Sequence, residues 1–435
     1  MKKIALTFVL FISLLGTSFA ENIFAHRFFE VKVDVPVNVS NNLVALTDIL
    51  QETAIIDLPQ IADNVKLFGA AIKANTSPSL SLNLDIPRGL ILGLSVGAEA
   101  DVGVGLSNDL FEFLGHGNTN MDDKNKFKMG AKNTYADLFA TAAVNGGWNF
   151  KKSRIEFTAT AFSSILHFDA GDTYAMVYMN DEENTVGYEA NVDAKLYTIV
   201  QTEQLQSVDA IMGAIQNNIG FDVSGSYKRD LFRFLSVGAS ARIPIVPSRL
   251  STGYVVQTNP PYKGEFSLDK MLGKDDDEES SGSEDTMEQE ETEEESSGFL
   301  GDPVILAQPY SIHRPMKIGV SADFHPFGTL LTTSGYLGLG FRHPFAAVIN
   351  KANGGVDETQ FYVDYSVAGR LSLWNIISLS LEHSYMDEIF KNEVALALNI
   401  RLVEVDAGVS FQSPSFTKSF TGAGVGAFVT VCVGF

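Results

Sequence analysis

The side chains that could carry catalysis or bind a metal are scattered along the sequence. The histidines are His26, His116, His167, His313, His325, His343 and His383. None of them has the spacing of a metal-binding motif. His325 and His343 each precede a proline, which is typical of a turn. His167 follows Ser163 and Ser164, but this spacing establishes no Ser–His pairing. The sequence therefore predicts no enzyme, no cofactor and no metal site.

Acidic residues are concentrated in one run, 275–297. Its first part, 275–295, holds thirteen Asp and Glu and no Lys or Arg, against a formal net charge of -22 for the whole chain. The run lacks the Asp-x-Asp-x-Asp-Gly spacing of a calcium loop, and its composition cannot build a core. We expect a solvated, disordered surface loop. The rest of the chain is only mildly acidic, so no basic face for nucleic acid is indicated.

Many other charged residues alternate with apolar ones. Between positions 90 and 106 the even positions are mostly apolar, whereas Glu99 and Asp101 are odd. A carboxylate facing lipid is costly, so the even face should contact lipid and the odd face a lumen. The same register predicts these lumen-facing charges: Glu99, Asp101, Arg242, Lys317, Arg342, Asp364, Glu382 and Arg401. Either they pair across strands and brace the wall, or they line a solute path.

This alternation recurs along the chain and predicts its strands. They cover 27–40, 80–86, 90–106, 135–150, 155–168, 218–228, 234–245, 316–324, 331–341, 361–371, 377–385, 394–402, 405–411 and 423–435. Two weaker runs within 173–197 would raise the number from fourteen to sixteen, but they are short or polar. At one end of the predicted barrel, short turns connect successive strands. At the other end, strands are connected by the long segments 41–77, 107–134 and 246–313. This asymmetry predicts an all-β fold, a transmembrane antiparallel β-barrel of about 14 strands.

The two ends of the sequence carry export features. Residues 1–20 read as a signal peptide, with Lys2 and Lys3 before an apolar stretch and a small-x-small site ending at Ala20. Residues 21–435 then form a single barrel domain. The last strand ends on Phe435, which resembles the terminal signal that the barrel-assembly machinery reads in Gram-negative outer membranes. We therefore expect localisation in the cell outer membrane, with outer-membrane lipid and that machinery as partners.

Two segments have helical rather than strand periodicity. In the insertion 41–77, Leu43, Leu46, Ile49 and Leu50 fall at helical spacing and are candidate contacts for a hydrophobic solute. In the loop 198–217, one face should carry Leu205, Val208, Ile211, Met212 and Ile215. These helices either cap the mouth of the barrel or form an apolar plug or capture surface.

Fourteen strands combined with helical insertions resemble the long-chain fatty-acid transporter (FadL-like) family. The resemblance implies an outer-membrane channel for small hydrophobic or amphipathic solutes and a hydrophobic small molecule as its ligand. The Asn-Pro-Ala motif of that family is missing, so the resemblance supplies no binding residue. Two alternatives remain: a general porin, and a surface-exposed adhesin or structural barrel that transports nothing.

Overall fold

The structure is a computed structural model. It describes residues 27–43, 58–65, 69–86, 89–117, 127–131, 134–180, 185–201, 204, 206–258, 261–267, 304–305, 309–351, 360–400, 402–421 and 423–435. The predicted signal peptide, 1–20, and the acidic run, 275–297, lie outside these residues.

Antiparallel strands dominate the described chain and close into a 14-strand barrel. The wall consists of β1 (Phe29–Asn41), β2 (Ala70–Thr76) with β3 (Ser79–Ile86) as one interrupted strand, β4 (Leu90–Leu106), β6 (Tyr135–Asn149), β7 (Ser153–Asp169), β11 (Gly220–Phe232), β12 (Leu235–Val246), β18 (Met316–Phe324), β19 (Leu331–Arg342), β20 (Gln360–Leu373), β21 (Ile377–Met386), β22 (Ile389–Asn399), β23 (Val403–Ser413) and β24 (Val425–Gly434). Neighbours in the wall are neighbours in the sequence, and β24 closes the barrel by pairing with β1. The predicted fold class and the preferred strand number are confirmed.

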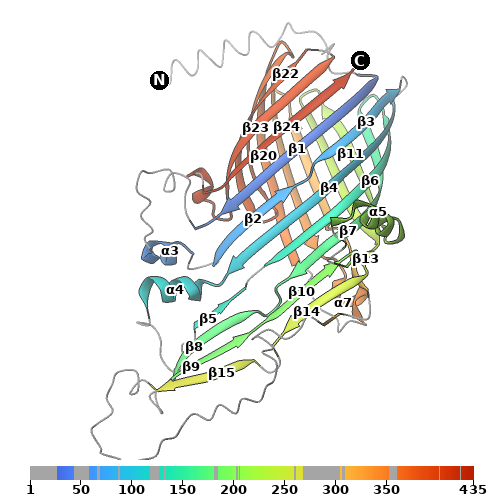
Figure 1. Cartoon of the computed structure of the whole chain (residues 1–435). Helices are drawn as coiled ribbons and strands as arrows, with labels where there is room; N and C mark the ends of the chain where they lie inside the picture. The colour runs from blue at the N-terminus through green and yellow to red at the C-terminus, as the bar shows by residue number, and fades with distance from the viewer. Residues whose placement is uncertain are drawn as a thin grey trace, which may run out of the picture.

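The two ends of the barrel differ, as Figure 1 shows. The described chain begins, at Arg27, and ends, at Phe435, where short turns join the strands, and we call this the terminal end. The long connections lie at the opposite end, which we call the loop end. There the structure describes α3 (Leu58–Val65), α4 (Asn108–His116), α7 (Ala346–Ile349) and the short helix η3 (Lys418–Phe420). The asymmetry expected from the turn lengths is therefore present.

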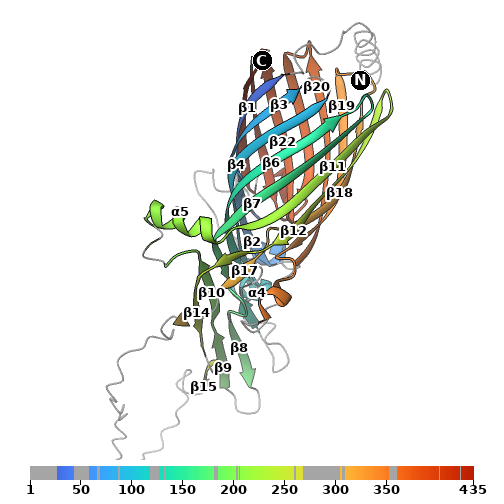
Figure 2. The ribbon, with the colours of Figure 1, turned by 90° about the vertical axis from the view of Figure 1, so that its right-hand side faces the viewer.

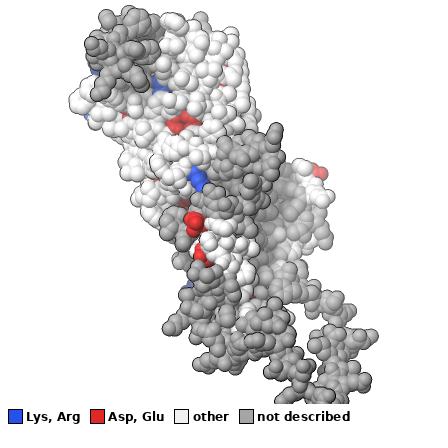
Figure 3. Space-filling model, turned by 90° about the vertical axis from the view of Figure 1, so that its left-hand side faces the viewer, with Lys and Arg blue, Asp and Glu red and all other residues white. Residues whose placement is uncertain are grey.

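Along each wall strand, side chains point alternately to the outer surface and to the lumen. Along β4 the even residues Leu94 and Val96 are more than half exposed, while Glu99 and Asp101 face the lumen. On the face shown in Figure 3, charged atoms are sparse over the barrel wall. Such an apolar outer band is what a bilayer requires of a spanning barrel. Among the described helices, none combines the length and the apolar run needed to cross a membrane.

Aromatic side chains frame this apolar band at both ends. At the terminal end, aromatic rings meet in the pairs Trp148–Phe150, Phe232–Phe234 and Phe29–Phe435, with centroids 5.4 to 6.4 Å apart. At the loop end, Tyr385 and Phe390 stand 4.3 Å apart, and Phe416 and Phe420 fold back beside Phe390 and His383. Two such girdles mark the two interfaces of a membrane-spanning barrel.

The predicted helical insertion is too long, because its last part belongs to the second wall strand. The helical segment was expected to extend over 41–77, but residues 70–76 are β2, which pairs with β1 and β4 in the same register as β3. The run Ala70-Ala71-Ile72 hides its alternation because alanine is small on both faces. The strand breaks at Pro78, beside Pro36 of β1. A proline cannot donate to the ladder, so this part of the wall has fewer hydrogen bonds.

The loop end extends well beyond the barrel, as Figure 2 shows. A separate four-stranded sheet contains β5 (Phe127–Gly130), β8 (Tyr174–Asn180), β9 (Thr185–Asn191) and β15 (Tyr262–Ser267). Three more strands, β10 (Asp193–Thr198), β14 (Thr252–Gln257) and β16 (Val304–Ile305), continue the wall from β7. The weak alternation within 173–197 thus belongs to an extension, and the loop 246–313 contains several strands of its own.

The second predicted helix is α5 (Val208–Asn217), which projects from the side of the barrel in Figure 2. Only part of the predicted apolar face of this helix is packed. A buried apolar cluster that includes Phe139, Phe162 and Leu250 contacts one side of this helix, formed by Ala210, Ile211, Ala214 and Ile215. Val208 and Met212 are exposed. Of the predicted apolar face, Ile211 and Ile215 are packed, whereas Val208 and Met212 are not, because the small residues Ala210 and Ala214 allow close approach on the other side of these isoleucines.

Candidate functional site

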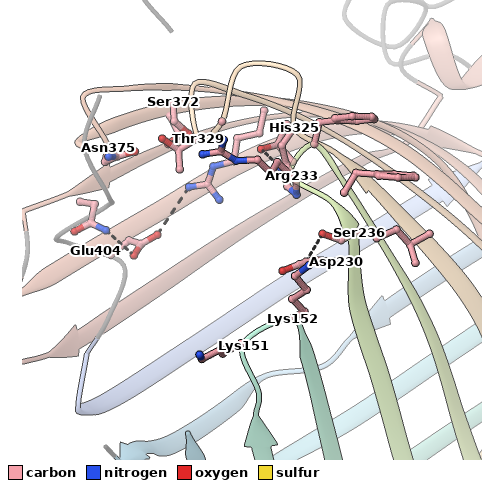
Figure 4. A pocket seen from close by; sticks show the side chains of 18 of the residues that line it. Lys151, Lys152, Asp230, Arg233, Ser236, His325, Thr329, Ser372, Asn375 and Glu404 are labelled. Atoms are coloured by element: carbon pink, nitrogen blue, oxygen red, sulfur yellow. Dashed lines mark hydrogen bonds and ion pairs between the residues drawn. The ribbon is translucent and has the colours of Figure 1, made fainter. Parts of the chain in front are cut away.

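The lumen near the terminal end holds a cavity of 1140 Å³, shown in Figure 4. Its wall comes mainly from the turns and strand ends of that rim. Leu231, Phe232 and Phe234 border the cavity at the rim, where the rings of Phe232 and Phe234 also belong to the aromatic girdle, and cationic side chains lie beside them. The cations around the cavity are Arg27, Lys151, Lys152, Arg233 and Arg370, and the acidic residues are Glu30, Asp230 and Glu404. The cavity therefore offers both apolar surface and an excess of positive charge.

Toward the loop end the lumen is crossed by ion pairs, which we call the charge cluster. Its members are Lys73, Glu99, Asp101, Asp222, Arg314, Lys317, Arg342, Asp364, Asp387 and Glu388. Arg314 follows the short strand β17 (Tyr310–Ile312), which pairs with β13 (Ser248–Leu250). The Arg314 guanidinium donates to Glu99 at 2.5 and 3.1 Å and to Asp222 at 2.6 Å. One side chain thus ties β4 to β11 across the inner wall.

A tight hairpin supplies further anions to the charge cluster. Asp387 and Glu388 form the two-residue turn between β21 and β22, and both have left-handed φ angles of 49° and 66°. Such turns favour Asn and Gly, so two acidic residues here are unusual. Lys317 lies 3.2 Å from Asp387, and Lys73 lies 2.6 Å from Glu388. These pairs hold the turn inside the lumen.

The surroundings of this turn also fix its charge. Burial alone would raise the pKa of Asp387, but Lys317 and Arg342 outweigh burial and hold that pKa below its usual range. Burial likewise opposes ionisation of Glu388, and Lys73 lowers its pKa overall. Both carboxylates are therefore ionised at neutral pH, and their pairs with Lys317 and Lys73 are present there.

A second cavity, of 260 Å³, lies within the charge cluster. Asn75, Thr76 and Ser77 border it beside the interruption of the second wall strand. Its charged lining residues are Glu99, Asp101, Asp137, Asp387, Arg242, Lys317 and Arg342. Four acidic residues thus face three basic ones, so the space is mildly attractive to cations.

Asp137 belongs to a buried group of three residues, which we call the His–Asp cluster. The Asp137 carboxylate lies 2.7 Å from Nδ1 of His167 and 2.8 Å from Nε2 of His343. The His167 ring packs parallel to Tyr310 with a centroid distance of 5.1 Å. The cluster joins β6, β7 and the chain that follows β19.

The lumen-facing charges expected from the register occupy the following places. Glu99, Asp101, Lys317, Arg342 and Asp364 lie in the charge cluster. Arg242 donates to the carbonyl of Pro315 at 2.8 Å, and Glu382 lies opposite Glu393 on β21 and β22. Arg401 lies outside the described residues. The structure thus brings most of these charges together at one level of the lumen.

The candidate solute contacts fall almost entirely outside the described part of the chain. Leu46, Ile49 and Leu50 lie in the undescribed segment 44–57. Leu43 is described, and its carbonyl accepts a hydrogen bond of 3.2 Å from Lys418. Their role as a capture surface therefore stays a prediction.

Several members of these clusters were not predicted from the sequence. Arg314 and the turn residues Asp387 and Glu388 belong to connections, where alternation gives no information. On a regular β7, odd-numbered residues such as His167 would point outward, away from the lumen. A β-bulge at Ile165, where Leu138 pairs with Leu166 but Phe139 pairs with Ser164, turns His167 inward.

Among the comparisons with known proteins, the matches come from solved structures. No protein-family model and no curated protein matches the sequence. The Ralstonia pickettii toluene transporter TbuX has 8% identity and a TM-score of 0.45, over 94% of this chain and 90% of that one. The P. putida toluene transporter TodX has 8% identity and a TM-score of 0.44, over 94% and 89%. The CymD monoaromatic hydrocarbon channel has 8% identity and a TM-score of 0.44, over 98% and 92%. The barrel assignment rests on the strand pairing described above.

Proposed function

We propose that the protein is an outer-membrane channel for small amphipathic or hydrophobic solutes. The observation that carries this proposal is the 1140 Å³ cavity in the lumen. Pockets that bind small molecules are typically mostly apolar, with a few polar groups that orient the ligand. Here the turn residues Leu231, Phe232 and Phe234 give the rim of the cavity an apolar border. Lys151, Lys152 and Arg233 supply positive charge. A solute with an apolar body and an anionic head suits both.

The charge cluster acts as the closure of this channel. It lies between the cavity and the loop end and joins several strands through buried ion pairs. Passage of a solute then requires these pairs to separate or rearrange. A permanently open porin needs no such barrier, which is why a gated channel is favoured over a general porin.

Transport by the purified full-length protein in proteoliposomes tests the proposal. Uptake of a labelled fatty acid and of toluene, the solute named for two similar structures, is compared with uptake of sucrose. We expect uptake of the amphipathic or hydrophobic compounds and little steady ion conductance in planar bilayers. Free passage of ions and sucrose without hydrophobic uptake would make the protein a general porin.

The undescribed apolar insertion provides a variant for the same assay. Replacing Leu46, Ile49 and Leu50 together by Ser removes the proposed capture surface without touching the described wall. Burial of an acyl chain contributes about 0.8 kcal/mol per CH₂, so its loss should be measurable. We expect reduced fatty-acid uptake and reduced co-purified lipid, with normal heat-modifiability of the barrel. Unchanged uptake would remove this segment from the solute path.

A surface-exposed structural or adhesive barrel is the second candidate function. The observation that favours it is the four-stranded sheet of β5, β8, β9 and β15, which stands beyond the loop end. A transport barrel does not require such an extension. Absence of both conductance and hydrophobic uptake in the wild-type protein would favour this second function.

A further inference from the structure

Three buried side chains from separate elements converge at the loop end of the lumen. Asp137 lies on β6, His167 on β7, and His343 directly after β19. Their exposed fractions are 6%, 0% and 5%. One nitrogen of each imidazole and the carboxylate of Asp137 all lie within 4.8 Å of one another. Two imidazoles and one carboxylate form a donor set typical of first-row divalent transition metals.

The spacing of these donors suits a metal ion after a small adjustment. Two ligands of a tetrahedral zinc ion, each about 2.1 Å from the metal, stand about 3.3 Å apart. The Asp137 oxygens lie 2.7 and 2.8 Å from the two imidazole nitrogens. The three donor atoms now lie within 4.8 Å of one another. An ion would be admitted if the two carboxylate contacts opened by about half an ångström and the two imidazoles moved closer together. The present hydrogen bonds would then be replaced by metal–ligand bonds.

The backbone at His343 has an unfavourable conformation, which the surrounding structure must hold in place. His343 has a φ of 46° although it is not glycine and precedes Pro344, and Phe345 has a φ of 66°. A left-handed residue before proline is sterically unfavourable. Such strain persists where the surrounding structure demands it, and it clusters at ligand and functional sites. Here the strained segment delivers the imidazole to Asp137.

The inner packing holds the other imidazole in place and leaves a route to the carboxylate. His167 packs parallel to Tyr310, and the His343 ring meets the His167 ring edge-on at 4.9 Å. Asp137 also borders the 260 Å³ cavity, where acidic residues outnumber basic ones. A cation that enters the lumen can thus reach the cluster.

We propose that Asp137, His167 and His343 bind one divalent transition-metal ion of the zinc class. The ion pins β6, β7 and the chain after β19 to one another, and so rigidifies the loop end of the lumen. This role is independent of the proposed transport function. An alternative is a purely hydrogen-bonded trio that binds no ion, and the experiment below separates the two.

Zinc binding by the chelator-treated, folded full-length protein tests the proposal. Equilibrium dialysis with Zn²⁺ followed by elemental analysis should find one ion per chain. Asp137→Asn and His343→Gln should each weaken binding at least a hundredfold. His383→Gln is the matched control, because His383 lies in the aromatic girdle of the outer wall and bonds to Tyr365 and Asn392. This control should bind as the wild type does.

A second measurement on the wild-type protein covers the case in which a variant fails to fold. Co²⁺ added to the chelator-treated protein should produce the visible absorption of a nitrogen-ligated site, and one equivalent of Zn²⁺ should abolish it. Zinc should also raise the temperature at which the wild type loses heat-modifiability, and leave the Asp137→Asn protein unaffected. No zinc uptake by the wild type, or equal uptake by the Asp137→Asn and His343→Gln proteins, would overturn the proposal.

Discussion

Arg314 connects two carboxylates of the inner wall that no backbone hydrogen bond joins. Its side chain is buried, and Asp222, one of its partners, is 1% exposed. Replacing Arg314 by Met would leave that carboxylate buried without a counter-ion. Removing one partner of a buried pair costs about 3–5 kcal/mol. We expect Arg314→Met to destabilise the folded barrel by this order and to raise its conductance in planar bilayers.

An exposed ion pair provides the control for this prediction. Lys128 lies 2.9 Å from Asp172, and both side chains are about half exposed or more. Exposed pairs contribute about 0–1 kcal/mol, so Lys128→Met should change neither the unfolding midpoint nor the conductance appreciably. Equal effects of the two substitutions would mean that the buried pair does not close the lumen.

The acidic hairpin turn predicts a response to pH. The pKa values of Asp387 and Glu388 lie below their usual ranges in the folded protein, so the folded state binds fewer protons than the unfolded state. The stability they contribute is present at neutral pH. It is lost as pH falls through the lowered values, which means below about pH 4.

Conductance recorded across a pH series measures this effect. We expect low conductance from pH 5 to 8 and a rise below about pH 4, as the turn loses its charge and releases Lys317 and Lys73. Asp387→Asn with Glu388→Gln should show the raised conductance already at neutral pH. A conductance that stays flat down to pH 3 would contradict the role of this turn in closure.

At the level of single residues, the sequence predicts inward charges on regular strands and misses those elsewhere. Glu99 and Asp101 follow from the parity of β4 alone. His167 does not, because a bulge shifts parity after Ile165. The partners of inward charges depend on which strands face each other across the lumen, and alternation within one strand carries no such information.

Among the elements, β4 provides the sharpest test of the inside–outside assignment. Leu94 is 56% exposed on the outer face, while its neighbour Ser95 points to the lumen. A cation on the lipid face near the bilayer midplane costs about 2–4 kcal/mol. Leu94→Arg should therefore lower folding yield in lipid bilayers, and Ser95→Arg should lower it much less. Equal yields would reverse the assignment of this strand.

The strands and helices differ in how clearly they can be predicted from the sequence. Long strands with bulky outward residues, such as β4 and β24, follow directly from alternation. β2 does not, because Ala70 and Ala71 mark neither face. Helical spacing gave one apolar stripe for α5, but it could not show which part of that stripe is packed, because small residues such as Ala210 and Ala214 also make close contacts.

For the whole molecule, the acidic run is predicted to be dispensable. Deleting 275–297 should leave the barrel folded, because so charged a segment cannot bury a core. Heat-modifiability of the deletion protein measures this. In cells with an intact outer membrane, an antibody or protease should reach the run, since it belongs to a connection at the loop end. Protection from both would place the loop end on the inner side of the membrane.

Assembly of the barrel is expected to depend on Phe435. Its ring lies 5.7 Å from that of Phe29, and the two residues exchange backbone hydrogen bonds of 3.0 and 3.1 Å. Phe435→Asp would place a charge in the aromatic girdle and should strongly reduce folded protein in the outer membrane without impairing export. Pulse labelling with a heat-modifiability readout measures this. Normal folded yield would remove the role of this residue in assembly.

The pairing of β1 with β24 also sets an order in time. The register runs from Glu30 opposite Gly434 to Val39 opposite Val425. The first wall strand therefore cannot complete its pairing before the last one has been made. Until β24 has been synthesised, β1 keeps an open edge that could pair with another chain. Contacts between such distant segments form slowly, because a very long loop must close first. In a chain with this connectivity, the edges of β1 and β24 stay open until the two ends of the wall meet.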